Sequence, residues 1–189
     1  KKEISSLAIQ VRYCYASNKR ARKPCQFSVS NLSGETRTHL ENVAGFPEQW
    51  ESRGFTCSDK TLTELHPDAS KLIYLTSDSE HTLEEMDDTK IYVIGGIVDR
   101  NRLKGATMQR AQSLGLKTAK LPISSYVSLA ATKVLTCNHV FEILVKYREN
   151  GKDWKGAMMD VLPQRKEIAS KEHDECEDNN DTKSTIASS

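Results

Sequence analysis

The fold is decided by the stretch Lys90-Ile-Tyr-Val-Ile-Gly-Gly-Ile-Val-Asp-Arg-Asn-Arg102. An unbroken apolar run that ends in two glycines is typical of a buried strand in a parallel sheet. Gly95 and Gly96 allow a positive φ or the close approach of another group. Ligands bind at the carboxyl ends of such strands. We therefore expect Asp99 at the rim of a site, with cationic side chains beside it.

The same pattern is also typical of an ordinary strand followed by a polar loop. No third glycine follows at the spacing of a dinucleotide-binding fingerprint, and no GxxxxGK[ST] motif occurs in the chain. These two classes of nucleotide-binding site are therefore excluded, and a plain polar loop remains the alternative reading of this stretch.

Length and composition indicate one domain with a real core. The chain has 189 residues, of which 37% are hydrophobic and 28% charged. Neither an apolar run of the roughly 20 residues that span a bilayer nor a signal peptide is recognisable. The five cysteines are Cys14, Cys25, Cys57, Cys137 and Cys176. They form no CxxC pair, so we expect neither a zinc site nor a disulfide framework. Most of them should be small residues that fill the core of a protein in a reducing compartment.

The charge is unevenly distributed along the chain. Seven of the 26 acidic residues but two of the 27 basic residues lie in residues 167–189, which leaves +6 on residues 1–166. A basic body with an acidic tail favours a polyanionic partner, although solvated lysines are the alternative. The tail has almost no apolar residues and is predicted to be disordered.

Spacing and turn residues predict alternating strands and helices. Helices are expected at 3–17, 37–43, 107–114, 133–147 and 154–161, and strands at 26–30, 71–76, 90–94 and 116–121. A short helix is expected at 81–86, with Ser79 as its N-cap. Gly115 should end the helix at 107–114, and Asp153 should be the N-cap of the helix at 154–161. This order indicates βα units around a parallel sheet. We expect a structural role for His139, which lies within a helix.

Two basic clusters flank this pattern. Residues 18–24 form a basic turn that includes Lys19, Arg20 and Arg22, and Gln164-Arg-Lys166 follows the last helix. Such clusters either grip phosphates or simply solvate a loop.

Several segments together resemble the SPOUT-class tRNA (guanine-9-N1)-methyltransferases. The resemblance covers residues 4–166 in the family's order and spacing. It is carried by Gln10-Val-Arg-Tyr-Cys-Tyr-Ala-Ser-Asn-Lys-Arg-Ala21, Leu72-Ile-Tyr-Leu-Thr-Ser-Asp-Ser79, Tyr92-Val-Ile-Gly-Gly-Ile-Val-Asp-Arg-Asn-Arg102, Lys120-Leu-Pro-Ile123, Lys133-Val-Leu-Thr-Cys-Asn-His-Val-Phe-Glu-Ile-Leu144 and Leu162-Pro-Gln-Arg-Lys166.

The resemblance implies a fold, a cofactor and a partner. The implied fold is a parallel sheet flanked by helices, with a C-terminal trefoil knot that is a rare exception to the usual connection rules. The implied domain is residues 1–166, followed by the acidic tail 167–189. S-adenosylmethionine is the implied cofactor and tRNA the implied substrate of a monomer. We expect a cytoplasmic or nuclear protein.

Three loops should form the cofactor pocket if the resemblance holds. They contain Leu75 and Thr76, then Gly95 and Gly96, and finally Leu121, Pro122, Lys133, Val134, Leu135 and Thr136. The amides that open the helix after this third loop are free to bind a ligand.

Asp99 matches the family's proposed general base. It would take the proton from guanine N1, or accept a hydrogen bond that positions the base. An ordinary aspartate, with a pKa of about 3.9, is a weak base, so burial would have to raise that pKa. With tRNA as the implied substrate, the candidates for contacts with RNA phosphates are Arg100, Arg102, Lys104, Lys19, Arg20, Arg22 and Arg165.

The sequence departs from the family at its amino terminus. The family has a strand and a basic extension upstream of the first helix, and this chain starts after both, so we expect a bare sheet edge and weaker phosphate binding.

Two alternative functions remain open. They are a non-catalytic tRNA-binding or processing-complex protein, and a methyltransferase for N1 of adenosine at the same position. Adenine N1 has no proton to remove, so Asp99 would matter less there.

Overall fold

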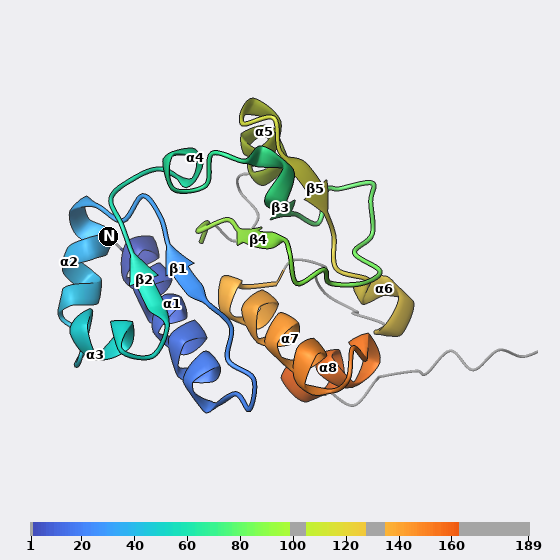
Figure 1. Cartoon of the computed structure of the whole chain (residues 1–189), viewed down its shortest axis with the longest axis horizontal. Coiled ribbons are helices and arrows are strands. Elements are labelled where there is room, and N and C mark those ends of the chain that lie inside the picture. Colours follow the sequence, from blue (N-terminus) through green and yellow to red (C-terminus); the bar gives the residue numbers. More distant parts are fainter. Residues whose placement is uncertain (1, 99–104, 128–134, 163–189) are drawn as a thin grey trace, which may run out of the picture.

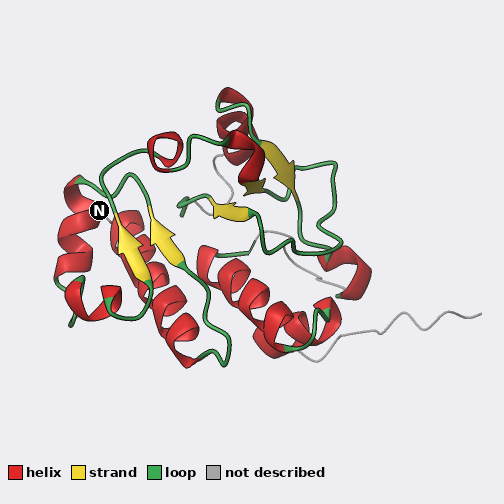
Figure 2. Cartoon of the chain, in the orientation of Figure 1, coloured by secondary structure: helices red, strands yellow, loops and turns green. Residues whose placement is uncertain are grey.

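The computed structural model describes residues 2–98, 105–127 and 135–162. The strands in this part all pair in parallel (Figure 1). One sheet pairs β1 (Phe27–Val29) with β2 (Phe55–Cys57), and the other has the order β4-β3-β5, made by Ile91–Ile94, Leu72–Leu75 and Lys117–Ala119. Helices flank these sheets (Figure 2). The predicted α/β class with parallel strands is confirmed, but the described strands form two sheets instead of the single one expected.

The three-stranded sheet brings the ends of its strands to one edge. Leu75, the last residue of β3, lies opposite both Ile94 of β4 and Ala119 of β5. The strands predicted at 71–76, 90–94 and 116–121 are therefore confirmed. Before β5, α5 (Ala106–Ser113) ends next to Gly115, which has a φ of 63°. A positive φ at this position is the reason that a glycine ends the helix.

Two long helices form a layer that both sheets share. α1 (Lys2–Arg20) contacts α7 (Cys137–Glu149), and α7 contacts β4. Phe27 of β1 and Ile94 of β4 pack against the same buried cluster between these helices. α1 continues to Arg20, beyond the predicted end at 17. α7 is shifted from the predicted 133–147, because Thr136 has an extended backbone and serves as its N-cap.

The last helix packs on α7 as predicted. α8 (Trp154–Val161) begins after Asp153, whose carboxylate accepts hydrogen bonds from the amides of Lys155 and Gly156 at 2.9 and 3.1 Å. Tyr147 of α7 stacks on Trp154 with ring centroids 3.9 Å apart. This contact lies in the main hydrophobic core, which also contains Leu75.

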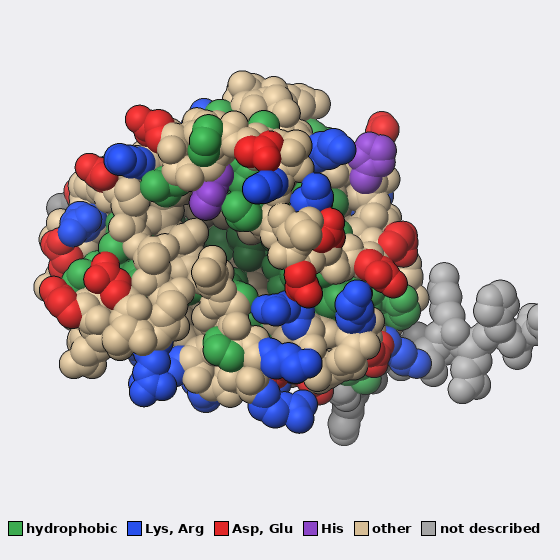
Figure 3. Space-filling model, in the orientation of Figure 1, with side chains coloured by type: hydrophobic (Ala, Val, Ile, Leu, Met, Phe, Trp, Pro, Cys, Tyr) green, Lys and Arg blue, Asp and Glu red, His purple; other side chains and the backbone are tan. Residues whose placement is uncertain are grey.

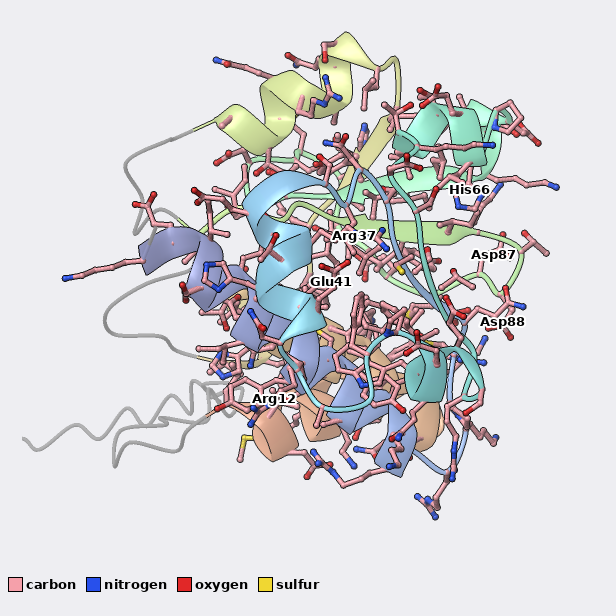
Figure 4. All side chains as sticks on the ribbon, turned by 90° about the vertical axis from the view of Figure 1, so that its left-hand side faces the viewer. Arg12, Arg37, Glu41, His66, Asp87 and Asp88 are labelled. Carbon is pink, nitrogen blue, oxygen red and sulfur yellow. The ribbon has the colours of Figure 1, made fainter. Side chains whose placement is uncertain are left out.

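An aromatic cluster holds the two-stranded sheet. Trp50 stacks on Tyr15 at 4.0 Å, and Phe46 and Phe55 meet Trp50 edge-on. This region contains α2 (Gly34–Glu41), expected at 37–43. It also contains α3 (Glu48–Glu51) and β2, which were not predicted because Gly45, Pro47 and Gly54 are typical of a loop. On the surface of α2, Arg37 pairs with Glu41 at 2.8 Å (Figure 4).

The helix predicted at 81–86 is wrong. Thr82 forms a parallel bridge with Lys120, and the Leu83 amide donates to the Lys120 carbonyl at 2.8 Å. This pairing, together with the burial of Leu83, holds the segment extended. Ser79 caps no helix, but its hydroxyl accepts from the His81 amide at 3.2 Å.

Three short helices complete the described chain. α4 (Leu62–Leu65) and a 3-10 helix (Ala69–Lys71) precede β3, and α6 (Ile123–Tyr126) follows Pro122; none of the three was predicted. In the part of the chain covered by the structure, no helix combines the length and apolar character that crossing a membrane requires.

Candidate functional site

The three predicted loops leave the larger sheet at one edge. Thr76 follows β3, Gly95 follows β4 and Leu121 comes two residues after β5, whose last residues are aligned with one another. The sheet therefore brings together six of the predicted cofactor residues, which are Leu75, Thr76, Gly95, Gly96, Leu121 and Pro122. This is the edge at which open parallel sheets bind ligands.

The loop after β3 is fixed by hydrogen bonds to β5. The Thr76 amide donates to the Ala119 carbonyl at 2.9 Å, and the Thr76 hydroxyl accepts from the Asp78 amide at 3.3 Å. Ser79 shares a hydrogen bond with the Thr118 hydroxyl at 3.0 Å. Thr76 and Ser79 are buried, and these bonds satisfy polar groups that would otherwise be costly to bury.

The two glycines after β4 lie close to side chains from β3 and α1. The Ile97 amide donates to the Gly95 carbonyl at 2.9 Å, which makes a tight turn. A Cβ on Gly95 would lie 3.2 Å from the Tyr74 hydroxyl, and one on Gly96 would lie 3.4 Å from Leu7. Neither glycine has a positive φ. Of the two reasons predicted for glycine here, positive φ is therefore wrong, and close approach applies to Gly95, whereas Gly96 makes ordinary van der Waals contact.

The start of α7 rests on this glycine turn. Thr136 is the N-cap, and its hydroxyl donates to the Asn138 side chain at 2.8 Å. The next residue, Cys137, donates from its thiol to the Gly95 carbonyl at 3.1 Å. Leu121 and Leu135 are partly buried against the main core. The structure thus brings Leu135 and Thr136 to the same edge as the other loops.

Two polar residues at this edge were not predicted. The buried Gln10 of α1 accepts a hydrogen bond from the Cys137 amide at 2.9 Å, across 127 positions of sequence. Cys137 was interpreted as a core filler. The available signal was the position of Gln10, three residues after Leu7 and four before Cys14, on the apolar side of the helix.

Burial controls the protonation of this edge. It raises the pKa of the Cys137 thiol above its ordinary value, so the thiol stays protonated and able to donate at neutral pH. Burial likewise raises the pKa of Tyr74, whose hydroxyl lies beside Gly95. The Cys137 thiol is therefore a neutral donor to the turn.

The remaining predicted residues of this site lie outside the described residues. They are Asp99, Arg100, Arg102, Lys104, Lys133, Val134 and Arg165.

The predicted basic turn lies at the other end of α1. Lys19 and Arg20 are exposed on the last helical turn, followed by the exposed Arg22. Lysine and arginine side chains gather along this lower edge of the molecule (Figure 3). The buried Asn18 holds the turn, since its side chain bonds both the amide and the carbonyl of Cys25 at 2.9 and 2.8 Å.

Glu149 of α7 anchors the same turn. It accepts from the Arg22 amide at 2.5 Å and from the Lys146 ammonium at 2.8 Å, while its own side chain is 5% exposed. The Lys146 hydrogen bond, followed by that of Arg22, holds the pKa of Glu149 below its ordinary value. The carboxylate therefore stabilises the fold in its charged form.

We expect the Glu149→Gln variant to lose about 1 kcal/mol of unfolding free energy at pH 7. The folded-state pKa is lowered, so this stabilisation is fully present above the unfolded pKa of about 4.3. It is lost as the pH falls through the lowered folded-state value. Urea denaturation of both proteins in a pH series should show a difference that shrinks in acid. Glu48→Gln, at an exposed position on α3, is the control; a difference that does not change with pH would contradict the prediction.

Comparison with known proteins places the chain. Residues 1–167 match the family model described as tRNA (guanine(9)-N(1))-methyltransferase TRM10/TRM10A. A tRNA (guanine(9)-N1)-methyltransferase of Schizosaccharomyces pombe is 40% identical over 97% of this chain and 60% of its own length. Human tRNA methyltransferase 10 homolog A is 41% identical over 87% of this chain and 48% of its own length. The chain thus spans about half to three-fifths of these relatives.

A solved structure agrees with these matches. The crystal structure of full-length spTrm10 in complex with SAH is 38% identical, covers 86% of this chain and 87% of its own, and superposes with a TM-score of 0.77. On the family model and these identities, the chain belongs to the TRM10/TRM10A family of tRNA (guanine(9)-N(1))-methyltransferases.

Proposed function

We propose that this protein transfers a methyl group from S-adenosylmethionine to N1 of guanosine at position nine of tRNA. The observation that carries the proposal is the meeting of three loops at one sheet edge, in a member of the TRM10/TRM10A family. A relative of 38% identity has been solved with SAH, the form that the cofactor takes after methyl transfer.

The residues at this edge fit the cofactor. An adenosine needs an apolar slot and backbone groups for its polar edge. Leu121 and Leu135 supply partly buried apolar side chains, and Thr76 and Gly95 bring main chain to the same rim. We infer that the loops bind the cofactor through Leu75, Thr76, Gly95, Gly96, Leu121, Pro122, Lys133, Val134, Leu135 and Thr136. S-adenosylmethionine supplies an activated methyl group when bound.

Asp99 is our candidate for the proton transfer. Guanine N1 carries a proton at neutral pH and becomes a good nucleophile once that proton leaves. Asp99 comes three residues after Gly96 in the sequence. We propose that its carboxylate accepts the N1 proton, or accepts a hydrogen bond that positions the base against the methyl group.

Two groups of cations are our candidates for tRNA binding. The basic turn carries the exposed Lys19, Arg20 and Arg22, and hydrogen bonds from Asn18 and Glu149 fix its backbone. We propose that they contact phosphates, because a phosphate backbone is recognised by arranged cations without base readout. From their positions in the sequence, the same role is proposed for Arg100, Arg102, Lys104 and Arg165.

The proposal extends to the domain, the knot, the oligomeric state and the location of the protein. We infer a SPOUT domain in residues 1–166 whose C-terminal part forms the trefoil knot, acting as a monomer in the cytoplasm or nucleus. The match of residues 1–167 to the TRM10/TRM10A family model supports this inference. The acidic tail predicted at 167–189 lies outside the described residues.

The alternatives are distinguished by one assay. Single-turnover methylation with labelled S-adenosylmethionine would compare tRNA transcripts that carry guanosine or adenosine at position nine. We expect label on the guanosine transcript alone. Label on the adenosine transcript would support N1 methylation of adenosine. Tight tRNA binding without methylation of either transcript would overturn the proposal in favour of a non-catalytic tRNA-binding protein.

A further inference from the structure

Two hydrogen bonds at one residue tie together three distant parts of the chain. The Cys137 amide donates to the Gln10 side chain at 2.9 Å, and the Cys137 thiol donates to the Gly95 carbonyl at 3.1 Å. The same thiol lies 3.9 Å from the Ile97 carbonyl. Cys137 therefore joins α1, the turn after β4 and its own helix.

α1 also touches the turn directly. The place of a Cβ on Gly96 is 3.4 and 3.6 Å from the two methyl groups of Leu7, which precedes Gln10 by almost one helical turn. Leu7 and Gln10 thus reach the glycine turn and the amino terminus of α7 from the same face of α1. A shift of either loop would have to break one of these contacts.

We infer that Gln10 and Cys137 form a brace that holds the glycine turn and the amino terminus of α7 at a fixed separation, and so set the affinity for the cofactor. The inference rests on the proposed function, which assigns both loops to S-adenosylmethionine. Gln10 and Cys137 are positioning residues in this account, because they act through the loops and not on the reacting atoms.

The physical chemistry of both groups suits a brace. Cys137 is the first residue of α7, so its amide has no partner within the helix. The amide oxygen of Gln10 supplies that partner at a buried site, where an unsatisfied donor is costly. The thiol is kept protonated by burial, so it can donate to Gly95 throughout the neutral range.

Variants of Gln10 test the brace through cofactor affinity. Gln10→Met keeps the length of the side chain and removes the acceptor, whereas Gln10→Glu keeps an acceptor. We expect calorimetric titration of the full chain with S-adenosylhomocysteine to show about tenfold weaker binding for Gln10→Met. Gln10→Glu should stay within about twofold of wild type. Gln112→Met, at an exposed position of α5, is the matched control.

Variants of Cys137 give an independent test if Gln10→Met does not fold. Cys137→Ala removes the donor to Gly95, and Cys137→Ser retains one. We expect about threefold weaker binding of S-adenosylhomocysteine for alanine, because a thiol is a weak donor, and recovery with serine. Cys57→Ala, in the other sheet, should leave the affinity unchanged.

The outcomes separate the inference from the function beneath it. The brace is supported if Gln10→Met and Cys137→Ala bind S-adenosylhomocysteine more weakly than wild type. Gln10→Glu and Cys137→Ser should then recover the affinity, and the affinity for tRNA should be unchanged in all four variants. The brace is contradicted, and the proposed function is not, if Gln10→Met and Cys137→Ala both bind S-adenosylhomocysteine as wild type does. The same conclusion follows if Gln10→Glu and Cys137→Ser lose as much affinity as they do. A wild-type protein that binds no S-adenosylhomocysteine overturns the proposed function, and the brace with it.

Discussion

Replacing Asp99 with asparagine is expected to slow single-turnover methylation of a guanosine-nine tRNA about 100-fold, the usual scale of general base catalysis. Asparagine has nearly the shape of aspartate but cannot take up the N1 proton. S-adenosylhomocysteine and tRNA should bind the variant as they bind wild type, because the loss falls on the chemical step. Rapid-quench assays at saturating enzyme would measure the rate.

The size of the loss distinguishes the two roles open to Asp99. If the carboxylate only positions the base, the asparagine amide oxygen can still accept a hydrogen bond, and the rate should fall about tenfold. Asp59→Asn, at an exposed position after β2, is the matched control and should react normally. A rate within about twofold of wild type in Asp99→Asn would contradict any role for this carboxylate in the reaction.

Replacing Trp154 with alanine is expected to lower the unfolding free energy by about 3–5 kcal/mol. The indole is buried against Tyr147, with ring centroids 3.9 Å apart, and its Nε1 donates to the Glu84 carbonyl at 2.7 Å. The substitution would leave a cavity between α7 and α8 and an unpaired carbonyl. Urea denaturation followed by circular dichroism would measure the loss, which is a large part of the 5–15 kcal/mol typical of a domain.

A second variant divides this loss into its parts. Trp154→Phe keeps an aromatic ring against Tyr147 and removes the hydrogen bond to Glu84, so it should cost about 1–3 kcal/mol. Trp50→Ala tests the other core, where the ring stacks on Tyr15. A loss below about 1 kcal/mol in Trp154→Ala would contradict the packing described for α7 and α8.

The parts of the fold that the sequence predicted well have strong local signals. β3 and β4 are continuous apolar runs, and α8 lies between a capping aspartate, Asp153, and a proline, Pro163. The helix expected at 81–86 failed because its conformation depends on pairing with Lys120, 38 positions after Thr82. Local spacing carries no information about such a partner.

Part of the candidate site was also visible in the sequence, and part of it required the structure. The position of Gly95 and Gly96 at a strand end was visible in the sequence, and Thr76 entered through the family resemblance; the structure brings all three to one sheet edge. Gln10 was missed because its role depends on the Cys137 amide, which only the fold brings within 2.9 Å. The close approach at Gly95 also required the structure, since Tyr74 comes from the neighbouring strand.

The most direct test of the proposed function is to identify the methylated nucleoside. A guanosine-nine tRNA transcript would be incubated with the full chain and S-adenosylmethionine carrying a deuterated methyl group, then digested and analysed by mass spectrometry. We predict deuterated 1-methylguanosine, mapped to position nine. The absence of labelled nucleoside although tRNA is bound, or label on a different base or atom, would contradict the proposed activity.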